Sequence, residues 1–121
     1  MREKLRVYEN KEITILATYK KYAITNHRRN NLFVNITDTD NNELTNHCWI
    51  KLKKSQEKLL QTRHIYTLKG TINTYYKKDK DGNKVMDYCI CNITEVKEVI
   101  LCYILKLKIL IVKNVAAKNM R

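Results

Sequence analysis

The chain has 121 residues, 44% of them hydrophobic, so it can bury one modest core and we expect a single small domain with short extensions. Its 24 Lys and Arg residues outnumber 12 Asp and Glu residues, and the net charge of +12 favours a polyanionic partner, either nucleic acid or an anionic membrane surface. With only two glycines, Gly70 and Gly82, the chain cannot form a glycine-rich phosphate loop.

The start of the chain does not look like a secretion signal, because residues 1–6 lead into a charged stretch instead of an apolar core. The four cysteines lie within apolar runs and have no regular spacing: Cys48, Cys89, Cys91 and Cys102. We therefore expect a cytoplasmic protein with free thiols.

Apolar residues alternate along two segments in the first third of the chain. Residues 11–24 place Ile13 and Ile15 on one face, and residues 32–37 place Val34 and Ile36 on one face, so each segment predicts a strand. Residues 25–31 are polar and basic and predict a loop between the two strands.

A turn, a third strand and a short helix are predicted next. Residues 38–43 are rich in Asp and Asn, which favour turns, and residues 44–52 predict a strand that pairs with the one before it. Ser55 can cap a helix over residues 55–62, although Lys58 stands where a capping box would have Glu or Gln.

The second half of the chain predicts a hairpin of two strands, residues 66–77 and 84–96, joined at a turn that contains Asp81-Gly82. Gly70 falls in the middle of the first of these strands, where it indicates a bulge or a sharp bend. The order is then three strands, a helix and two strands. It predicts a mainly β, five-stranded Greek-key barrel of the OB-fold type, a fold that binds oligonucleotides.

Two segments resemble small OB-like proteins of phages and other mobile elements of Gram-positive bacteria. Residues 35–50 run from a strand through an acidic turn into a segment with His47 and Trp49, and Asp87 and Tyr88 lie on the last strand of the barrel. The resemblance covers residues 11–98 and implies a single-stranded DNA-binding protein that acts in replication or recombination.

The tail, residues 99–121, is treated as an extension of a domain at residues 1–98. Residues 99–112 are strongly apolar but are too few to span a membrane, and Lys106 and Lys108 share a face only on a strand. We expect an additional strand, which could extend the sheet or form a homodimer through residues 99–113. The rival hypothesis is a basic amphipathic segment on a membrane surface.

Single-stranded nucleic acid is held by cationic grooves and by aromatic rings that stack on bases. Alternation predicts that two strands carry rings and lysines on one face, with Leu68, Ile72 and Tyr76 in the core. The predicted binding residues on these strands and on the strand beside them are Phe33, Asn35, Trp49, Lys51, Lys53, Lys69, Asn73 and Tyr75. Trp49 could instead be a core residue. Tyr75 could instead cover one end of the barrel, with its hydroxyl in water.

Basic residues in the two predicted hairpin loops are expected to contact phosphates, which supply most non-specific affinity. The residues expected to do so are Arg28 and Arg29 in the first loop and Lys77, Lys78, Lys80 and Lys84 around the second. DNA is the expected partner, and RNA is the alternative.

Enzyme, metal and cofactor functions are not predicted. No nucleophile elbow or paired-histidine metal helix occurs, and the Cys89-x-Cys91 spacing is shorter than that of most zinc sites. On one strand face these two cysteines would equally suit packing as small hydrophobic residues. The remaining functional alternative is a protein-interaction module, for example a phage inhibitor of a host nucleic-acid enzyme.

Overall fold

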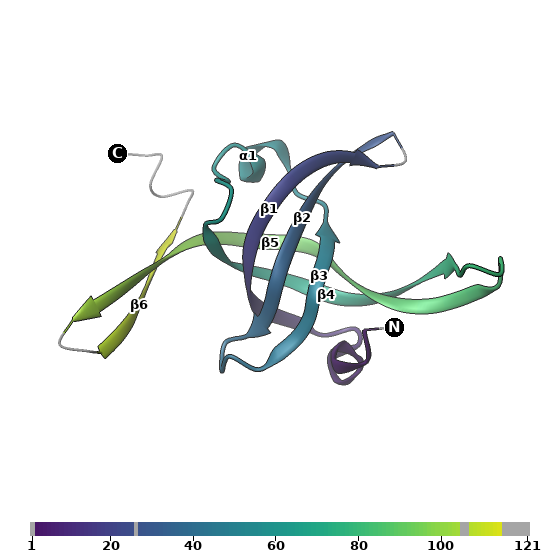
Figure 1. The fold of residues 1–121 in the computed structure, drawn as a ribbon, viewed down its shortest axis with the longest axis horizontal. Helices are drawn as coiled ribbons and strands as arrows, with labels where there is room; N and C mark the ends of the chain where they lie inside the picture. Colours follow the sequence, from purple (N-terminus) through teal and green to yellow (C-terminus); the bar gives the residue numbers. More distant parts are fainter. Residues whose placement is uncertain (1, 26, 105–106, 115–121) are drawn as a thin grey trace.

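The computed structural model describes residues 2–25, 27–104 and 107–114, with side chains as far as Ile100. These residues form one antiparallel sheet with the strand order β3-β2-β1-β4-β5-β6 (Figure 1). The elements are the 3-10 helix η1 (Glu3–Tyr8), strands β1 (Glu12–Thr25), β2 (Arg28–Asp38) and β3 (Glu43–Ile50), helix α1 (Lys54–Glu57), and strands β4 (Ile65–Lys78), β5 (Lys84–Ile104) and β6 (Leu107–Asn114).

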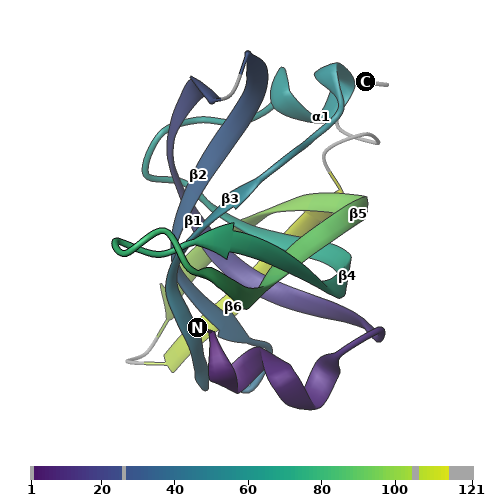
Figure 2. The same cartoon turned by 90° about the vertical axis from the view of Figure 1, so that its right-hand side faces the viewer.

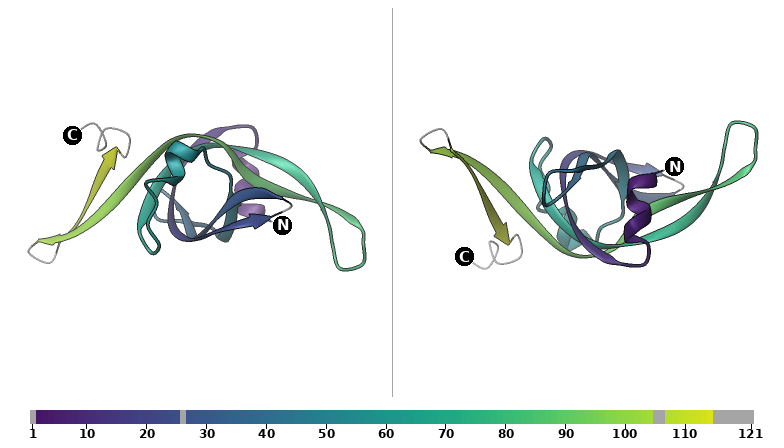
Figure 3. Two further views of the ribbon diagram at one scale, coloured as in Figure 1. Left: turned by 90° about the horizontal axis from the view of Figure 1, so that it is seen from above. Right: turned by 90° about the horizontal axis from the view of Figure 1, so that it is seen from below.

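The sheet curls around one hydrophobic core, so that β3 comes to face β5 (Figure 3). Alternate residues of each strand point into this core, including Ile15 on β1, Ile36 on β2 and Leu68 on β4, each of which is fully buried. The predicted mainly β, antiparallel architecture is confirmed. A closed barrel is not confirmed, because no ladder of backbone hydrogen bonds joins β3 to β5 in the described part of the chain.

The bulge predicted at Gly70 is confirmed. Lys69 pairs with Glu95 and Thr71 with Cys91, so β5 carries extra residues opposite Gly70, and Asn92 among them has a φ of 52°. A Cβ atom on Gly70 would lie 2.8 Å from the Cys91 carbonyl oxygen and 2.6 Å from Ile93 Cδ1. Glycine is required here by close approach of the two strands.

The predicted loop at residues 25–31 was too long. β2 already begins at Arg28, and Arg28 and Arg29 pair with Thr25 and Ile24 of β1. His27, with a φ of 61°, lies in the turn. Polar composition suggested a loop, but an exposed hairpin end tolerates polar and basic residues on both strands.

The helix predicted over residues 55–62 is a single turn, α1. Its start is one residue earlier than expected, because the Gln56 side chain accepts a hydrogen bond of 2.9 Å from the Lys53 backbone N–H. The Tyr66 hydroxyl accepts a hydrogen bond of 2.7 Å from the Gln61 N–H, which a longer helix would use for its own backbone bond.

The third strand, β3, ends at Ile50, two residues earlier than predicted.

The predicted boundary between residues 98 and 99 falls within a continuous strand. β5 runs to Ile104, past the predicted end of the fifth strand at Val96, and β6 then pairs with its last part from Lys97 onwards. The additional strand is therefore confirmed, and the β5–β6 hairpin projects from the body of the sheet (Figure 1). The side chains of residues 101–112 lie outside the described ones.

The element that the sequence did not predict is η1, shown in purple at the lower end of the curled sheet in Figure 2. Leu5 on this helix is fully buried in the core. Among the described residues, no helix has the length and the apolar character that crossing a bilayer requires.

Candidate functional site

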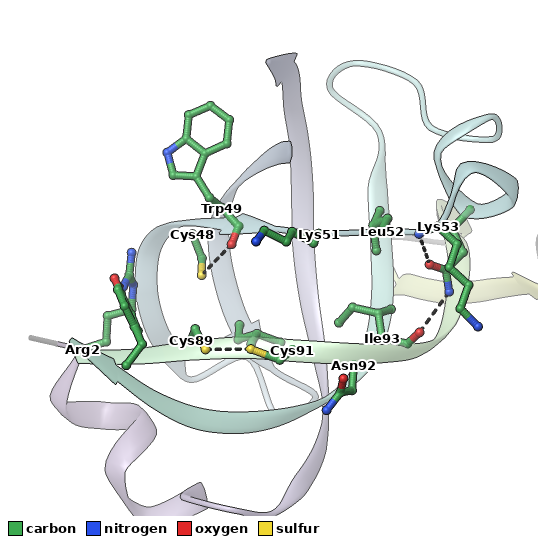
Figure 4. Close-up of a pocket in the computed structure, with 13 residues that line it drawn as sticks. Arg2, Cys48, Trp49, Lys51, Leu52, Lys53, Cys89, Cys91, Asn92 and Ile93 are labelled. Atoms are coloured by element: carbon green, nitrogen blue, oxygen red, sulfur yellow. Dashed lines mark hydrogen bonds between the residues drawn. The ribbon is translucent and has the colours of Figure 1, made fainter. Parts of the chain in front are cut away.

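A groove of about 600 Å³ follows the line where β3 and β5 face each other without pairing (Figure 4). We call it the seam groove. Its walls come from β3 and the segment after it on one side and from β5 on the other, with Tyr75 of β4 and the N-terminal Arg2 at one end. The lining residues are Arg2, Cys48, Trp49, Lys51, Leu52, Lys53, Gln56, Tyr75, Cys89, Ile90, Cys91, Asn92 and Ile93.

Side chains make hydrogen bonds across both ends of the seam groove. At one end, Arg2 donates a hydrogen bond of 3.4 Å to the His47 carbonyl on β3 and one of 3.1 Å to the Tyr88 carbonyl on β5. At the other end, the Gln56 side-chain amide donates to the Ile93 carbonyl at 3.1 Å. Side-chain bonds therefore connect β5 to β3 at one end of the groove and to α1 at the other.

The buried carboxylate of Asp87 anchors Arg2. Only 2% of Asp87 is exposed, and its oxygens accept hydrogen bonds from the Arg2 backbone N–H at 2.7 Å, the Lys77 ammonium at 2.7 Å and the Tyr88 N–H at 2.8 Å. Burial alone would raise the pKa of Asp87, but these donors and the Arg2 charge lower it to about 2. Lys77, predicted to contact phosphate, is thus ion-paired within the protein.

The structure brings Trp49 and Tyr75 into the same groove as Lys51 and Lys53. Trp49 is half-buried, while its neighbours Cys48 and Ile50 point into the core with 2% and 0% exposure, as the alternation along this strand predicted. The Tyr75 hydroxyl accepts a hydrogen bond of 3.3 Å from Arg2. Lys51 and Lys53 are exposed.

The prediction that Phe33 binds nucleic acid is wrong, because its side chain is completely buried and cannot stack on a base. It lies opposite Cys48 on β3 and against the Tyr19 ring, with 5.4 Å between ring centroids, whereas Trp49 lies opposite Leu32. Directly opposite residues share a face of the sheet, so Phe33 and Trp49 belong to different faces. Asn35 is exposed on β2 with a φ of 53°, outside the seam groove.

The predicted residues of β4 divide between two places. Asn73 is half-buried beside the cysteines of the groove, where its side-chain amide helps to lower the pKa of Cys91. Lys69 forms an ion pair of 3.6 Å with Glu12 and lines a separate hollow of about 320 Å³ with Glu95 and Lys97. Tyr76, predicted in the core, is 63% exposed because β4 extends beyond the body of the sheet at that point.

The two hairpins that carry the other predicted basic residues project on the same side of the molecule (Figures 1 and 3). On the β1–β2 hairpin, Arg29 lies 5.2 Å from the Tyr22 ring centroid and pairs with Glu57 of α1 at 2.9 Å. On the β4–β5 hairpin, Lys84 lies 4.9 Å from the ring centroid of Tyr76. Arg28, Lys78, Lys80 and Lys84 are exposed.

Two free thiols, Cys89 and Cys91, lie side by side in the seam groove with 2.7 Å between their sulfurs. The hydrogen bond between the two thiols lowers the pKa of Cys91 to about 7 against the effect of burial, and it raises the pKa of Cys89. Burial raises the pKa of Cys48. Within the described residues, no group of three or more His, Cys, Asp or Glu side chains is arranged to hold a metal ion.

Comparisons with protein-family models, with curated proteins and with solved structures found no significant match to this chain. The function is therefore inferred from the chemistry of the seam groove and of the hairpins beside it.

Sequence reasoning missed the residues that shape the ends of the groove. Arg2 is 85 positions away from Asp87, and no local pattern connects them. Gln56 was not singled out, although a Gln three positions after the N-cap residue, here Lys53, is one signature of a helix start. The shared face of Cys89 and Cys91 was predictable from the period of a strand and was predicted.

Proposed function

We propose that this chain is a non-catalytic protein that binds single-stranded DNA along the seam groove. We further propose that its curled sheet is an OB-fold, a barrel type that is itself partly open. The role that we propose is in replication or recombination of a phage or mobile element, as the resemblance of residues 35–50 and of Asp87-Tyr88 to proteins of such elements implies.

The observation that carries the proposal is the lining of the groove. Tyr75, a half-buried aromatic residue, lines the groove together with the exposed Lys51 and Lys53, and Trp49 borders it with its indole ring turned away from Cys89 and Cys91 (Figure 4). A strand bound there could stack a base on a ring while its phosphates meet the lysines, which is the combination that sequence-tolerant single-strand binding requires.

The projecting hairpins add cationic surface on one side of the groove. Arg28, Lys78 and Lys80 are exposed on them, and the net charge of +12 attracts a polyanion from a distance. Lys77, Arg29 and Lys69 already pair with carboxylates, so we assign them a smaller share of the phosphate contacts.

The test is fluorescence anisotropy of a labelled oligothymidine, titrated at several salt concentrations beside a duplex of equal length and an oligouridine. We expect tighter binding to the single strand, quenching of Trp49, and an affinity that falls steeply with salt. The oligouridine separates DNA from RNA preference. Equal, weak binding to single strand and duplex would contradict the proposal and would favour a partner protein with an acidic surface.

Variants locate the binding surface. Trp49→Leu keeps an apolar side chain but removes the ring, and we expect roughly 5- to 100-fold weaker binding from the loss of one stacked base. Lys51→Ala should reduce the salt slope by about 0.7 for one lost phosphate contact. The matched control is Lys97→Ala, which removes the same charge from the separate hollow. An equal loss in Lys97→Ala would show that only the overall charge matters.

A further inference from the structure

We propose that Cys91 and Cys89 form an oxidation site, in which the Cys91 thiolate reacts with hydrogen peroxide and Cys89 then closes an intrachain disulfide. This chemistry goes beyond the proposed function and does not depend on it, because it needs only the two thiols and their surroundings in the groove.

The geometry brings the two sulfurs together. Cys89 and Cys91 are two positions apart on β5, so their side chains share one face of the strand, and their sulfurs are 2.7 Å apart (Figure 4). A disulfide bond is about 2.05 Å long, so bond formation needs only a small further approach.

The surroundings distinguish the two thiols. The hydrogen bond between the two thiols, the Asn73 amide and Lys51 across the groove all favour the charged form of Cys91. In contrast, Cys91 and Cys48 of β3 disfavour the thiolate form of Cys89 and raise its pKa. Since the thiolate is the nucleophile, Cys91 is the attacking residue and Cys89 the resolving one.

Access also separates this pair from the other described cysteine. Cys89 and Cys91 are half-exposed in a groove of about 600 Å³, which admits a molecule as small as peroxide. Cys48 lines the same groove but is only 2% exposed, and burial keeps its thiol protonated. Oxidation should therefore be selective among thiols that lie close together.

The reaction balances in two steps. The Cys91 thiolate attacks one oxygen of hydrogen peroxide, the O–O bond breaks, and Cys91 becomes a sulfenic acid while hydroxide leaves. The Cys89 sulfur then attacks the Cys91 sulfur, a disulfide forms, and the sulfenic oxygen leaves as water with the Cys89 proton. Peroxide accepts the two electrons that the thiols lose.

The first experiment uses the full, reduced chain treated with limiting hydrogen peroxide, then alkylated under denaturing conditions and digested with trypsin. Both cysteines fall in the peptide of residues 85–97, and we expect that peptide to lose two hydrogen atoms in mass and to resist alkylation. Cys48, in another peptide, should stay fully alkylated. A disulfide to Cys48, a link between chains or no disulfide at all would overturn the proposal.

The second experiment assigns the two roles with dimedone, which traps sulfenic acids. We expect Cys89→Ser to accumulate the adduct on Cys91, and Cys91→Ser to form none on Cys89. If a variant does not fold, dimedone present in excess during oxidation of the wild-type chain should still mark Cys91. An adduct on Cys89 in either experiment would contradict the assignment.

Discussion

Gly70 shows how one position without a side chain controls the path of β5. The Cys91 carbonyl and the Ile93 side chain occupy the space that a Cβ atom would need. We expect Gly70→Ala to lower the free energy of unfolding by about 1–3 kcal/mol, because overpacking forces the backbone apart. Urea denaturation measures this change. Thr74→Ala, at an exposed position of the same strand, is the control, and equal stability of both variants would contradict the predicted clash.

Asp87 should make stability depend on pH. Its pKa is about 2 in the folded protein and 3.8 when unperturbed, so its contribution is fully present above about pH 4 and is lost as the pH falls through 2. The shift corresponds to about 2 kcal/mol. We expect Asp87→Asn to destabilise the protein at neutral pH and to flatten this pH dependence in urea denaturation. Asp40→Asn, in the exposed β2–β3 turn, should keep the acid sensitivity of the wild type.

Cys91 should be alkylated faster than an ordinary thiol at neutral pH. Its pKa of about 7 means that about half of it is thiolate there, and the groups facing it are Cys89, Cys48 and Lys51. We expect the iodoacetamide rate at Cys91 to rise through pH 7 and then level off. A Lys51→Ala variant should shift this midpoint upward. A rate that keeps rising beyond pH 9, as for a free thiol with a pKa of about 8.5, would refute the prediction.

Single residues were predictable where local alternation decides their environment. Trp49 is half-exposed between the buried Cys48 and Ile50 because those three residues follow the period of one strand. Tyr76 broke the pattern because its strand continues beyond the core. Phe33 broke it because the alternation along β2 is interrupted at Asn35, whose φ is 53°, so that Phe33 and Ile36 are both buried. The partners of Arg2 come from residues distant in sequence, which a local pattern cannot reveal.

At the scale of elements, η1 is held on the sheet through Arg2. The Arg2 guanidinium donates hydrogen bonds to Asp87, to Tyr75 and to carbonyls of both seam strands. Losing bonds to a buried carboxylate costs about 1–3 kcal/mol, so we expect Arg2→Ala to be destabilising by that amount and to change Trp49 fluorescence. Arg6→Ala, at an exposed position of the same helix, is the control. A variant as stable as the control would mean that Leu5 alone holds η1.

The strands were predictable because β-branched and aromatic residues recur with a period of two and Asp81-Gly82 marks a hairpin. The ends of the elements were less predictable than the elements themselves. β2 begins among basic residues, and α1 stops after one turn because the Tyr66 hydroxyl takes a backbone donor from the following segment. Both boundaries are decided by partners that the local sequence does not contain.

At the scale of the whole molecule, the outer edge of β6 is unpaired in the sheet order of the described chain. The apolar composition of residues 99–112 makes a lone projecting hairpin marginal in water, and a second copy could pair along this edge. We therefore expect a homodimer, with a melting temperature that rises with protein concentration. Sedimentation velocity over a dilution series tests this. A monomer at every concentration would exclude the dimer.

The order of elements allowed the mainly β architecture to be predicted, but not whether β3 and β5 pair. Pairing depends on how far the sheet curls, which the bulge opposite Gly70 and the early end of β3 at Ile50 affect together. The groove that carries the proposed binding lies at this unpaired seam. Its lysines and aromatic residues were named from the sequence, while Arg2 and the position of the groove between these two strands were not.

The bond between Arg2 and Asp87 joins residues 85 positions apart, which has a consequence for the order in which a ribosome-bound chain matures. Arg2 is synthesised long before β5, and closing so long a loop has an entropic cost that nearby contacts do not have. The seam groove must then be among the last parts to assemble during synthesis. The groove would offer a ligand its full set of lining residues only after synthesis has passed Ile93.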